Sequence, residues 1–145
     1  MADRRRMVRA LLLALAFLGA VAPTSAAEIS KEDAAAIRAV ISEQLDAFAR
    51  DDAPRAFSLA TAGIRAQFGT PEVFMEMVRS EYPVVYRPKS VQFEPPEFVE
   101  GQVVQTVRMA DAAGRQWLAI YPMLREAGRW RTNGCLLQRL QGVQT

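Results

Sequence analysis

Histidine is absent from this chain of 145 residues. Its absence excludes Ser-His-Asp and Cys-His catalysis, histidine acting as a general base, and nearly all zinc and copper sites. Cysteine occurs once, as Cys135, so no intramolecular disulfide can form. We interpret Cys135 as a buried thiol that packs like a small apolar group, with an intermolecular disulfide or a redox role as alternatives. We therefore expect neither a bound metal nor a cofactor.

A long hydrophobic run is also lacking. The uncharged segment Ala10–Ala22 falls short of the ~20 apolar residues that a membrane-spanning helix needs. It follows the basic start Met1–Arg9 and precedes the small residues Pro23–Ala27, an order typical of a secretory signal peptide. We predict cleavage after Ala26 or Ala27 and a mature protein that is periplasmic or secreted and no longer attached to the membrane.

Net charge of one sign is missing once the predicted signal peptide, residues 1–26, is removed. That segment holds four of the 18 basic residues and one of the 16 acidic residues, which leaves 14 basic against 15 acidic. A balanced charge gives no general attraction to nucleic acid or to an anionic membrane, so we expect neither as a partner. Residues 27–145 have a length that suits a single domain with one core.

Helical periodicity marks the first half of that domain. Ser30 followed by Asp33 resembles a capping box at the start of a helix. Apolar residues then recur at the three- and four-residue spacing of one helical face, namely Ile37, Val40, Ile41, Leu45 and Phe48. A proline and its preceding acids predict a second helix over Pro54–Ala60. Thr70, with a proline after it, predicts a third over Pro71–Glu81.

The second half has the period of β-strands. Val103, Gln105, Val107 and Met109 alternate with the residues between them and fall on one strand face. Short turns that contain glycine join β-rich runs as antiparallel hairpins. These runs are Val103–Met109, Arg115–Leu124 and Arg129–Arg139, preceded by the proline-interrupted β-rich segments Tyr82–Tyr86 and Ser90–Glu94. Pro122 indicates an edge position or a bulge in its strand.

Helices followed by antiparallel strands predict an α+β domain. We expect the N-terminal helices to pack on a curved antiparallel sheet of about four strands, because sheets twist and each apolar helix face must be covered. The space enclosed between the helices and the sheet is the natural place for a ligand pocket.

A specific set of residues runs through nearly all of the mature chain. It comprises Ile37–Phe48, Asp51–Asp52, Ala56–Phe57, Ala60, Ile64–Arg65, Phe68–Pro71, Phe74, Met77–Pro88, Val104–Val107, Tyr121, Gly128–Arg131 and Gly134–Cys135. With these residues, of which Met77–Pro88 is the most specific segment, the chain resembles the bacterial family called domain of unknown function 4864. The wider resemblance is to the nuclear transport factor 2-like superfamily, which implies a cone-shaped fold. It implies no function, since isomerases, dehydratases, binding subunits and transport factors share that fold.

Three tyrosines and two arginines are the predicted ligand-binding residues. Tyr82, Tyr86 and Tyr121 each combine an apolar ring with one hydrogen-bonding group, and Arg79 and Arg87 carry a planar fork that suits a carboxylate or a phosphate. We expect them to form a polar rim on the cavity. The alternative is that the tyrosines pack in the core and the arginines lie over it.

These observations favour a noncatalytic module that binds a small molecule or a protein through its cavity or its outer sheet face. The alternative is a metal-independent enzyme, isomerase- or lyase-like, that uses a Tyr/Arg/carboxylate cluster in the cavity. It requires an acid within hydrogen-bond reach of a tyrosine. The candidate acids in the β-rich half are Glu94, Glu97, Glu100 and Asp111, whereas Asp46 and Asp51 are expected to face solvent or to cap. A homodimer formed through the sheet is a further alternative.

Overall fold

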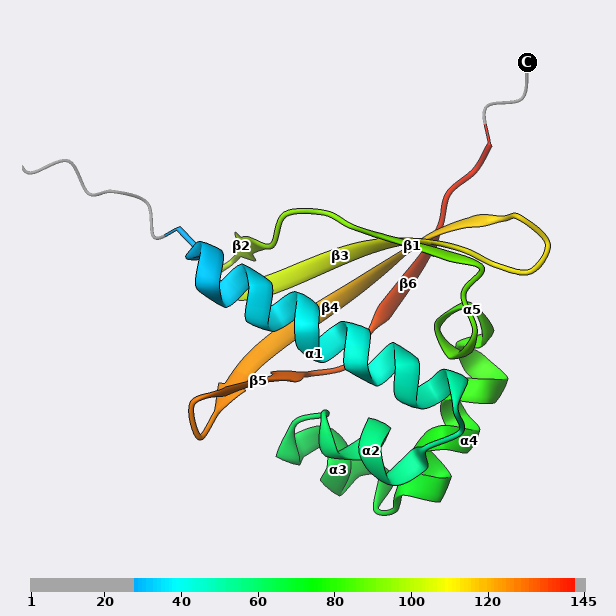
Figure 1. Cartoon of the computed structure of the whole chain (residues 1–145), viewed down its shortest axis with the longest axis horizontal. Helices are drawn as coiled ribbons and strands as arrows, with labels where there is room; N and C mark the ends of the chain where they lie inside the picture. The colour runs from blue at the N-terminus through cyan, green and yellow to red at the C-terminus, as the bar shows by residue number, and fades with distance from the viewer. Residues whose placement is uncertain (1–27, 143–145) are drawn as a thin grey trace, which may run out of the picture.

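The computed structural model describes residues 28–142, so the predicted signal peptide of residues 1–26 lies outside the described residues. The helices are α1 (Lys31–Ala49), α2 (Ala53–Ser58), α3 (Ala62–Phe68), α4 (Pro71–Glu81) and α5 (Pro83–Tyr86). The strands are β1 (Ser90–Phe93), β2 (Glu97–Val99), β3 (Gln102–Ala110), β4 (Gln116–Glu126), β5 (Arg129–Thr132) and β6 (Leu136–Arg139). Helix α1 crosses one face of the sheet, and α2, α3 and α4 gather beyond it (Figure 1). This is the predicted α+β arrangement.

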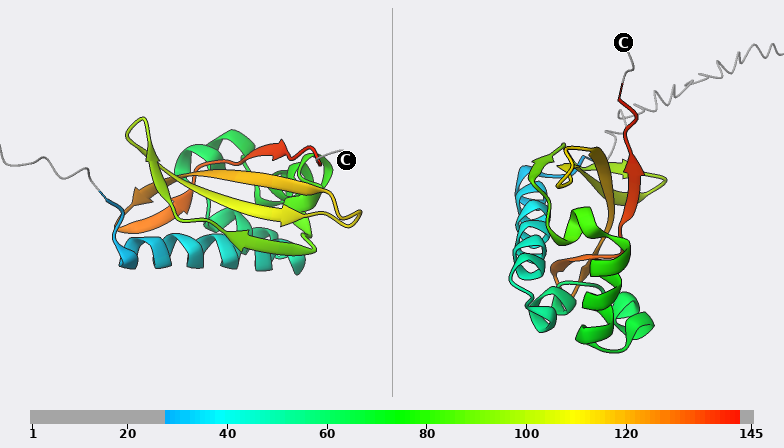
Figure 2. Two further views of the ribbon diagram at one scale, coloured as in Figure 1. Left: turned by 90° about the horizontal axis from the view of Figure 1, so that it is seen from above. Right: turned by 90° about the vertical axis from the view of Figure 1, so that its right-hand side faces the viewer.

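The predicted apolar stripe holds α1 in place. All five of its residues, Ile37, Val40, Ile41, Leu45 and Phe48, are buried. The Ser30 side chain accepts a hydrogen bond from the Asp33 N–H at 3.0 Å, which caps the first turn as predicted. The view from above shows α1 running along one side of the sheet (Figure 2). The stripe therefore sets which face of α1 packs into the core.

Three of the shorter helices differ from the sequence prediction. Helix α2 begins at Ala53 because the Asp52 side chain accepts a hydrogen bond from the Arg55 N–H at 3.1 Å, and it ends at Ser58, before the expected Ala60. Helix α3, capped by Thr61, was not expected at all. The prediction of β structure over Tyr82–Tyr86 is wrong. Pro83 begins a helical turn there, because a proline fits the first position of a helix, where no N–H is needed.

Six strands occupy four positions in the sheet. Strands β3 and β4 pair antiparallel in the middle, with Val103 opposite Met123 and Ala110 opposite Gln116. Strands β1 and β2 both pair with the free edge of β3, and β5 and β6 both pair with the free edge of β4. Each outer position is thus one strand broken in two. The four positions agree with the number of strands that the sequence predicts.

Both breaks are β-bulges. The segment Phe93–Glu97 has one residue more than Val104–Val107, which it faces on β3. In the same way Thr132–Leu136 has one residue more than Ile120–Met123 on β4. An extra residue bends a strand and increases its twist. Pro122 lies on β4 opposite the second bulge, where its carbonyl accepts from the Asn133 N–H at 2.8 Å. Because β4 is paired on both sides and the extra residue belongs to the neighbouring strand, neither the edge position nor the bulge predicted in the strand of Pro122 is found there.

The two bulges lie on one line across the sheet. Gln105 of β3 and Tyr121 of β4 are directly opposite each other on that line, and both are buried on the face that the helices cover. The Gln105 amide nitrogen donates to the backbone oxygens of Glu94, in the first bulge, and of Thr106 at 2.9 Å. The sheet therefore bends at Gln105 and Tyr121, and the bend turns these two polar side chains inward.

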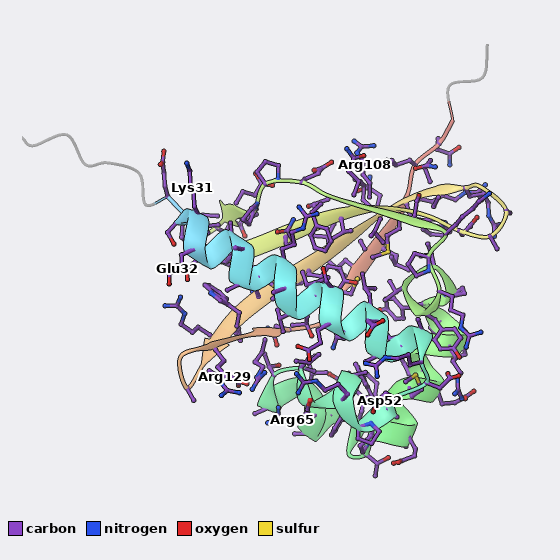
Figure 3. All side chains as sticks on the ribbon, in the orientation of Figure 1. Lys31, Glu32, Asp52, Arg65, Arg108 and Arg129 are labelled. Atoms are coloured by element: carbon purple, nitrogen blue, oxygen red, sulfur yellow. The ribbon has the colours of Figure 1, made fainter. Side chains whose placement is uncertain are left out.

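Most charged side chains of the described residues lie on the outside of the domain, whereas Asp111 is buried. Glu32, Arg108 and Arg129, for example, are at the periphery (Figure 3). Ion pairs between such exposed groups, for example Arg108 with Glu94 at 3.0 Å, contribute little to stability individually. In the range 28–142, no helix has the length and apolar character needed to cross a bilayer.

Candidate functional site

A cavity of about 580 Å³ lies between the helices and the bend of the sheet. Its volume falls within the range of ~300–1,000 Å³ typical of small-molecule sites. The apolar wall consists of Phe48, Ala60, Ile64, Phe68, Phe74, Met77, Val78, Val85, Pro122 and Leu136. The polar side chains in the wall are Gln44, Gln67, Glu81, Tyr82, Tyr121, Thr132, Asn133 and Cys135. An apolar interior with few polar groups is the usual composition of such a site.

An aromatic cluster builds the helical wall of the cavity. The ring of Phe74 on α4 lies 5.9 Å from Phe48, 5.7 Å from Phe57 and 5.6 Å from Phe68, measured between ring centroids. The tilted arrangements are those that aromatic pairs prefer. Because the three partners belong to α1, α2 and α3, Phe74 holds all of these helices against α4 and gives the wall a rigid apolar surface.

Tyr121 presents the most unusual polar group of the cavity. Its side chain is 2% exposed, and its hydroxyl has no hydrogen-bond partner among the described residues. Burial raises the pKa of Tyr121 well above its usual value, and the nearby Cys135 thiol adds to the shift. That thiol lies close enough to the hydroxyl to act on its pKa, but a thiol is only a weak hydrogen-bonding partner. A buried donor without a partner costs ~1–3 kcal/mol, so such groups are rare.

Two other ionisable groups of the cavity wall, Cys135 and Tyr82, also keep their protons. Burial raises the pKa of Cys135 to about 12, although the Tyr121 hydroxyl partly offsets this effect. The thiolate is the reactive form of cysteine, so Cys135 is an unreactive thiol in this state. Burial, followed by the charges of Cys135 and Glu81, raises the pKa of Tyr82. At neutral pH the inner cavity therefore offers protonated, uncharged groups.

Three side-chain amides, Gln44, Gln67 and Asn133, also line the cavity, and the sequence prediction missed all three. Gln44 donates through Nε2 to the Ala56 carbonyl at 3.0 Å, and among residues 28–142 its amide oxygen has no hydrogen bond. Asn133 accepts from the Thr61 hydroxyl at 2.9 Å. A glutamine in the helical stripe, three residues after Ile41, was the available signal for Gln44. The position of Asn133 depends on the bulge and had no such signal.

The five predicted ligand-binding residues separate into two groups. Tyr82 and Tyr121 line the cavity, whereas Arg79, Tyr86 and Arg87 do not. The latter three converge instead on Asp51. Arg79 Nη2 donates to Asp51 Oδ1 at 2.9 Å, Arg87 Nη2 donates to Oδ2 at 3.2 Å, and the Tyr86 hydroxyl donates to Oδ1. The expected polar rim of tyrosines and arginines is thus not formed.

The Asp51 cluster, defined as Asp51, Arg79, Tyr86 and Arg87, connects helices by hydrogen bonds and ion pairs. Asp51 follows α1 with a φ of 55°, and the other members belong to α4, to α5 and to the residue after it. The two guanidinium groups lie over the Tyr86 ring, 5.6 Å and 4.8 Å from its centroid. Hydrogen bonds from Tyr86 and then Arg79 lower the pKa of Asp51. Asp51 faces solvent as expected, and its carboxylate in addition joins these three residues.

The other candidate acids do not reach the cavity. Glu94 pairs with Arg108, and Asp111 accepts from the Trp117 indole at 2.9 Å and from Arg115 at 2.7 Å. These bonds lower the pKa of Asp111 to about 2 and fix the β3–β4 turn. Within residues 28–142, Glu81 is the one charged side chain in the cavity wall. In that same range no three potential ligands among His, Cys, Asp and Glu converge on a metal position.

A family model described as a domain of unknown function (DUF4864) matches residues 30–145. The chain belongs to the DUF4864 family. This match confirms the family predicted from the sequence. Comparison of this DUF4864 member with curated proteins gives no match.

A solved structure shows the same fold. The 1.8 Å structure of Aln2 from a Streptomyces species superposes on this DUF4864 chain with a TM-score of 0.52 at 17% sequence identity. The match covers 78% of this chain and 94% of that chain. Helices followed by a curled antiparallel half-barrel sheet form the cone-shaped fold of the nuclear transport factor 2-like superfamily, as predicted. At this identity the likeness establishes the fold alone.

Proposed function

We propose that the mature protein is an exported module that binds one small molecule in the cavity beneath the bend of the sheet. The observation that carries this proposal is the Tyr121 hydroxyl, buried in the wall of a cavity of about 580 Å³ with no partner among the described residues. Buried polar groups almost always have a partner. A ligand atom in the cavity would supply the missing one.

The chemistry of the cavity favours binding over catalysis. A general acid or base works best with a pKa near the working pH. Burial moves the pKa values of Tyr82, Tyr121 and Cys135 upward, away from neutrality. The carboxylate that contacts a tyrosine, Asp51, bonds to Tyr86 outside the cavity. These features support a protein that holds a molecule without transforming it.

Export rests on the sequence of residues 1–26. Their basic start, apolar segment and small residues are those of a secretory signal peptide. A binding module released by cleavage after Ala26 or Ala27 would meet its ligand outside the cytoplasm.

Native mass spectrometry of protein purified from a periplasmic extract without refolding tests both parts of the proposal. We expect the mass of the cleaved chain plus a reproducible small adduct. A Met77→Trp variant fills the cavity and should lose the adduct. Its matched control is Val73→Trp on the same helix, because Val73 is 53% exposed and lies outside the cavity wall. This control should keep the adduct.

The possible results separate export from binding. Uncleaved protein confined to the cytoplasm would contradict export and leave binding to be judged by the adduct. Cleaved protein without any adduct, or an adduct that survives in Met77→Trp, would contradict binding in this cavity.

A further inference from the structure

We propose that the ligand is an uncharged, largely apolar molecule that places a hydrogen-bond-accepting oxygen, such as a carbonyl, against the Tyr121 hydroxyl. This inference rests on the proposed function and specifies the chemistry of the same site. Three features of the cavity carry it: its charge, the direction of the free hydrogen bond, and the shape of the apolar wall.

The charge of the cavity disfavours an anion. Among the described residues, no arginine or lysine lines it, and Glu81 is its one charged group. Arg79 and Arg87 bond to Asp51, and Arg65 donates to the Ala60 carbonyl at 2.7 Å. A buried anion without a cation or several donors loses its hydration without compensation. An anionic ligand would therefore meet a carboxylate and no opposite charge.

The direction of the hydrogen bond follows from the chemistry of Tyr121. Its hydroxyl stays protonated, and the thiol beside it is only a weak acceptor. The O–H proton therefore lacks a good acceptor within the protein. A carbonyl or ether oxygen of a ligand supplies one, whereas an alkyl group in the same place leaves the hydroxyl unsatisfied.

The shape of the wall selects the rest of the molecule. Phe48, Phe68 and Phe74 present tilted rings to the cavity, and Met77 adds a flexible thioether. Such surfaces pack best against rings and branched apolar groups. We infer a body of one or more rings with its oxygen at the end that approaches β4.

Equilibrium dialysis of the mature protein with three naphthalene probes tests this inference. The probes are 2-acetylnaphthalene, which carries a carbonyl, 2-ethylnaphthalene, which has no polar group, and 2-naphthoate, which is an anion. We expect the acetyl probe to bind roughly threefold to tenfold more tightly than the ethyl probe, the range of one net hydrogen bond, and the naphthoate to bind most weakly. In Tyr121→Phe the preference for the acetyl probe should fall below twofold.

The control variant is Tyr86→Phe, which also removes one tyrosine hydroxyl but does so outside the cavity and should keep the full preference. Tightest binding of naphthoate, an acetyl preference that survives in Tyr121→Phe, or no binding of any probe would each overturn the inference. The adduct found by mass spectrometry is an independent measurement. An adduct together with failure of the probes would therefore overturn the ligand class and leave binding in the cavity intact.

Discussion

Two tyrosines, Tyr86 and Tyr121, show how differently this domain uses the same side chain. The Tyr86 hydroxyl lies outside the cavity and bonds to Asp51, and two guanidinium groups lie over its ring. The Tyr121 side chain lines the cavity, and its buried hydroxyl has no hydrogen-bond partner among the described residues. Tyr86 therefore makes a structural contact. Tyr121 keeps a hydrogen-bond donor that the protein itself does not use.

The difference follows from where the charges are placed. Arg79 and Arg87 both bond to Asp51, and among the described residues no arginine or lysine lines the neighbouring cavity. The hydrogen bonds of Asp51 connect the end of α1 to α4 and α5, and they stabilise the helical wall of the cavity. The polar cluster thus supports the site by positioning helices and leaves the contact with a ligand to Tyr121.

The largest expected effect comes from disrupting helix α4, which contributes both to the cavity wall and to the Asp51 cluster. Helix α4 carries Phe74 toward the aromatic cluster and Arg79 toward Asp51. We expect Phe74→Ala to lower the free energy of unfolding by about 3–5 kcal/mol, as measured by urea denaturation, because it removes a buried ring at the centre of four helices. Val73→Ala, an exposed change on the same helix, should stay within ~0.5 kcal/mol of the wild type. A loss below 1 kcal/mol for Phe74→Ala would show that the cluster does not hold the helices together.

A smaller effect is expected from the Asp51 cluster. Asp51→Asn removes the negative charge while keeping a residue type that tolerates the positive φ of this position. We expect the Tm to fall by a few degrees at pH 7, because two arginines lose their ionised acceptor. Binding of 2-acetylnaphthalene should weaken only slightly, since the cluster lies outside the cavity. A large loss of binding with an unchanged Tm would contradict the division between the two regions.

A smaller effect of Asp51→Asn is expected in the way the Tm depends on pH. The pKa of Asp51 is lowered in the folded protein, so the unfolded state binds the proton first as the pH falls. The contribution of Asp51 is fully present above its unfolded pKa of ~3.9 and is lost below it. The Tm difference between wild type and Asp51→Asn should therefore be constant from pH 7 to 5 and shrink as the pH drops below ~4. A difference that grows on acidification would contradict this assignment.

Most of the fold was predictable because its signals are local. The helical stripe from Ile37 to Phe48, the Thr70 cap and the alternation in β3 each depend on neighbours a few residues away. The error at Tyr82–Tyr86 has the same origin. Its valines and tyrosines are strong β-formers, but Pro83 and the packing of Val84 and Val85 in the core decide for a helical turn.

The site was less predictable because it depends on distant residues. Tyr121 and Asn133 meet in the cavity only through a bulge whose extra residue becomes visible when β5 and β6 are paired with β4. The capture of Arg79 and Arg87 by Asp51 joins positions that are 28 and 36 residues apart. No local pattern reports such a contact. The sequence could single out the tyrosines and arginines as candidates, but only the fold shows which of them line the cavity and which belong to the Asp51 cluster.

The stability of Tyr121→Phe in the absence of ligand tests the central claim most directly. Wild type and variant would be stripped of bound molecules by unfolding and refolding, and their free energies of unfolding compared in urea, with Tyr86→Phe as the matched control. We predict that Tyr121→Phe is more stable than wild type by about 1 kcal/mol or more, because it removes a buried hydroxyl without a partner. Tyr86→Phe should be less stable by ~0.5–1.5 kcal/mol, because it loses a formed hydrogen bond. A loss of stability in Tyr121→Phe would mean that this hydroxyl already has a hydrogen-bond partner in the protein. That result would contradict the proposal that it bonds to a ligand.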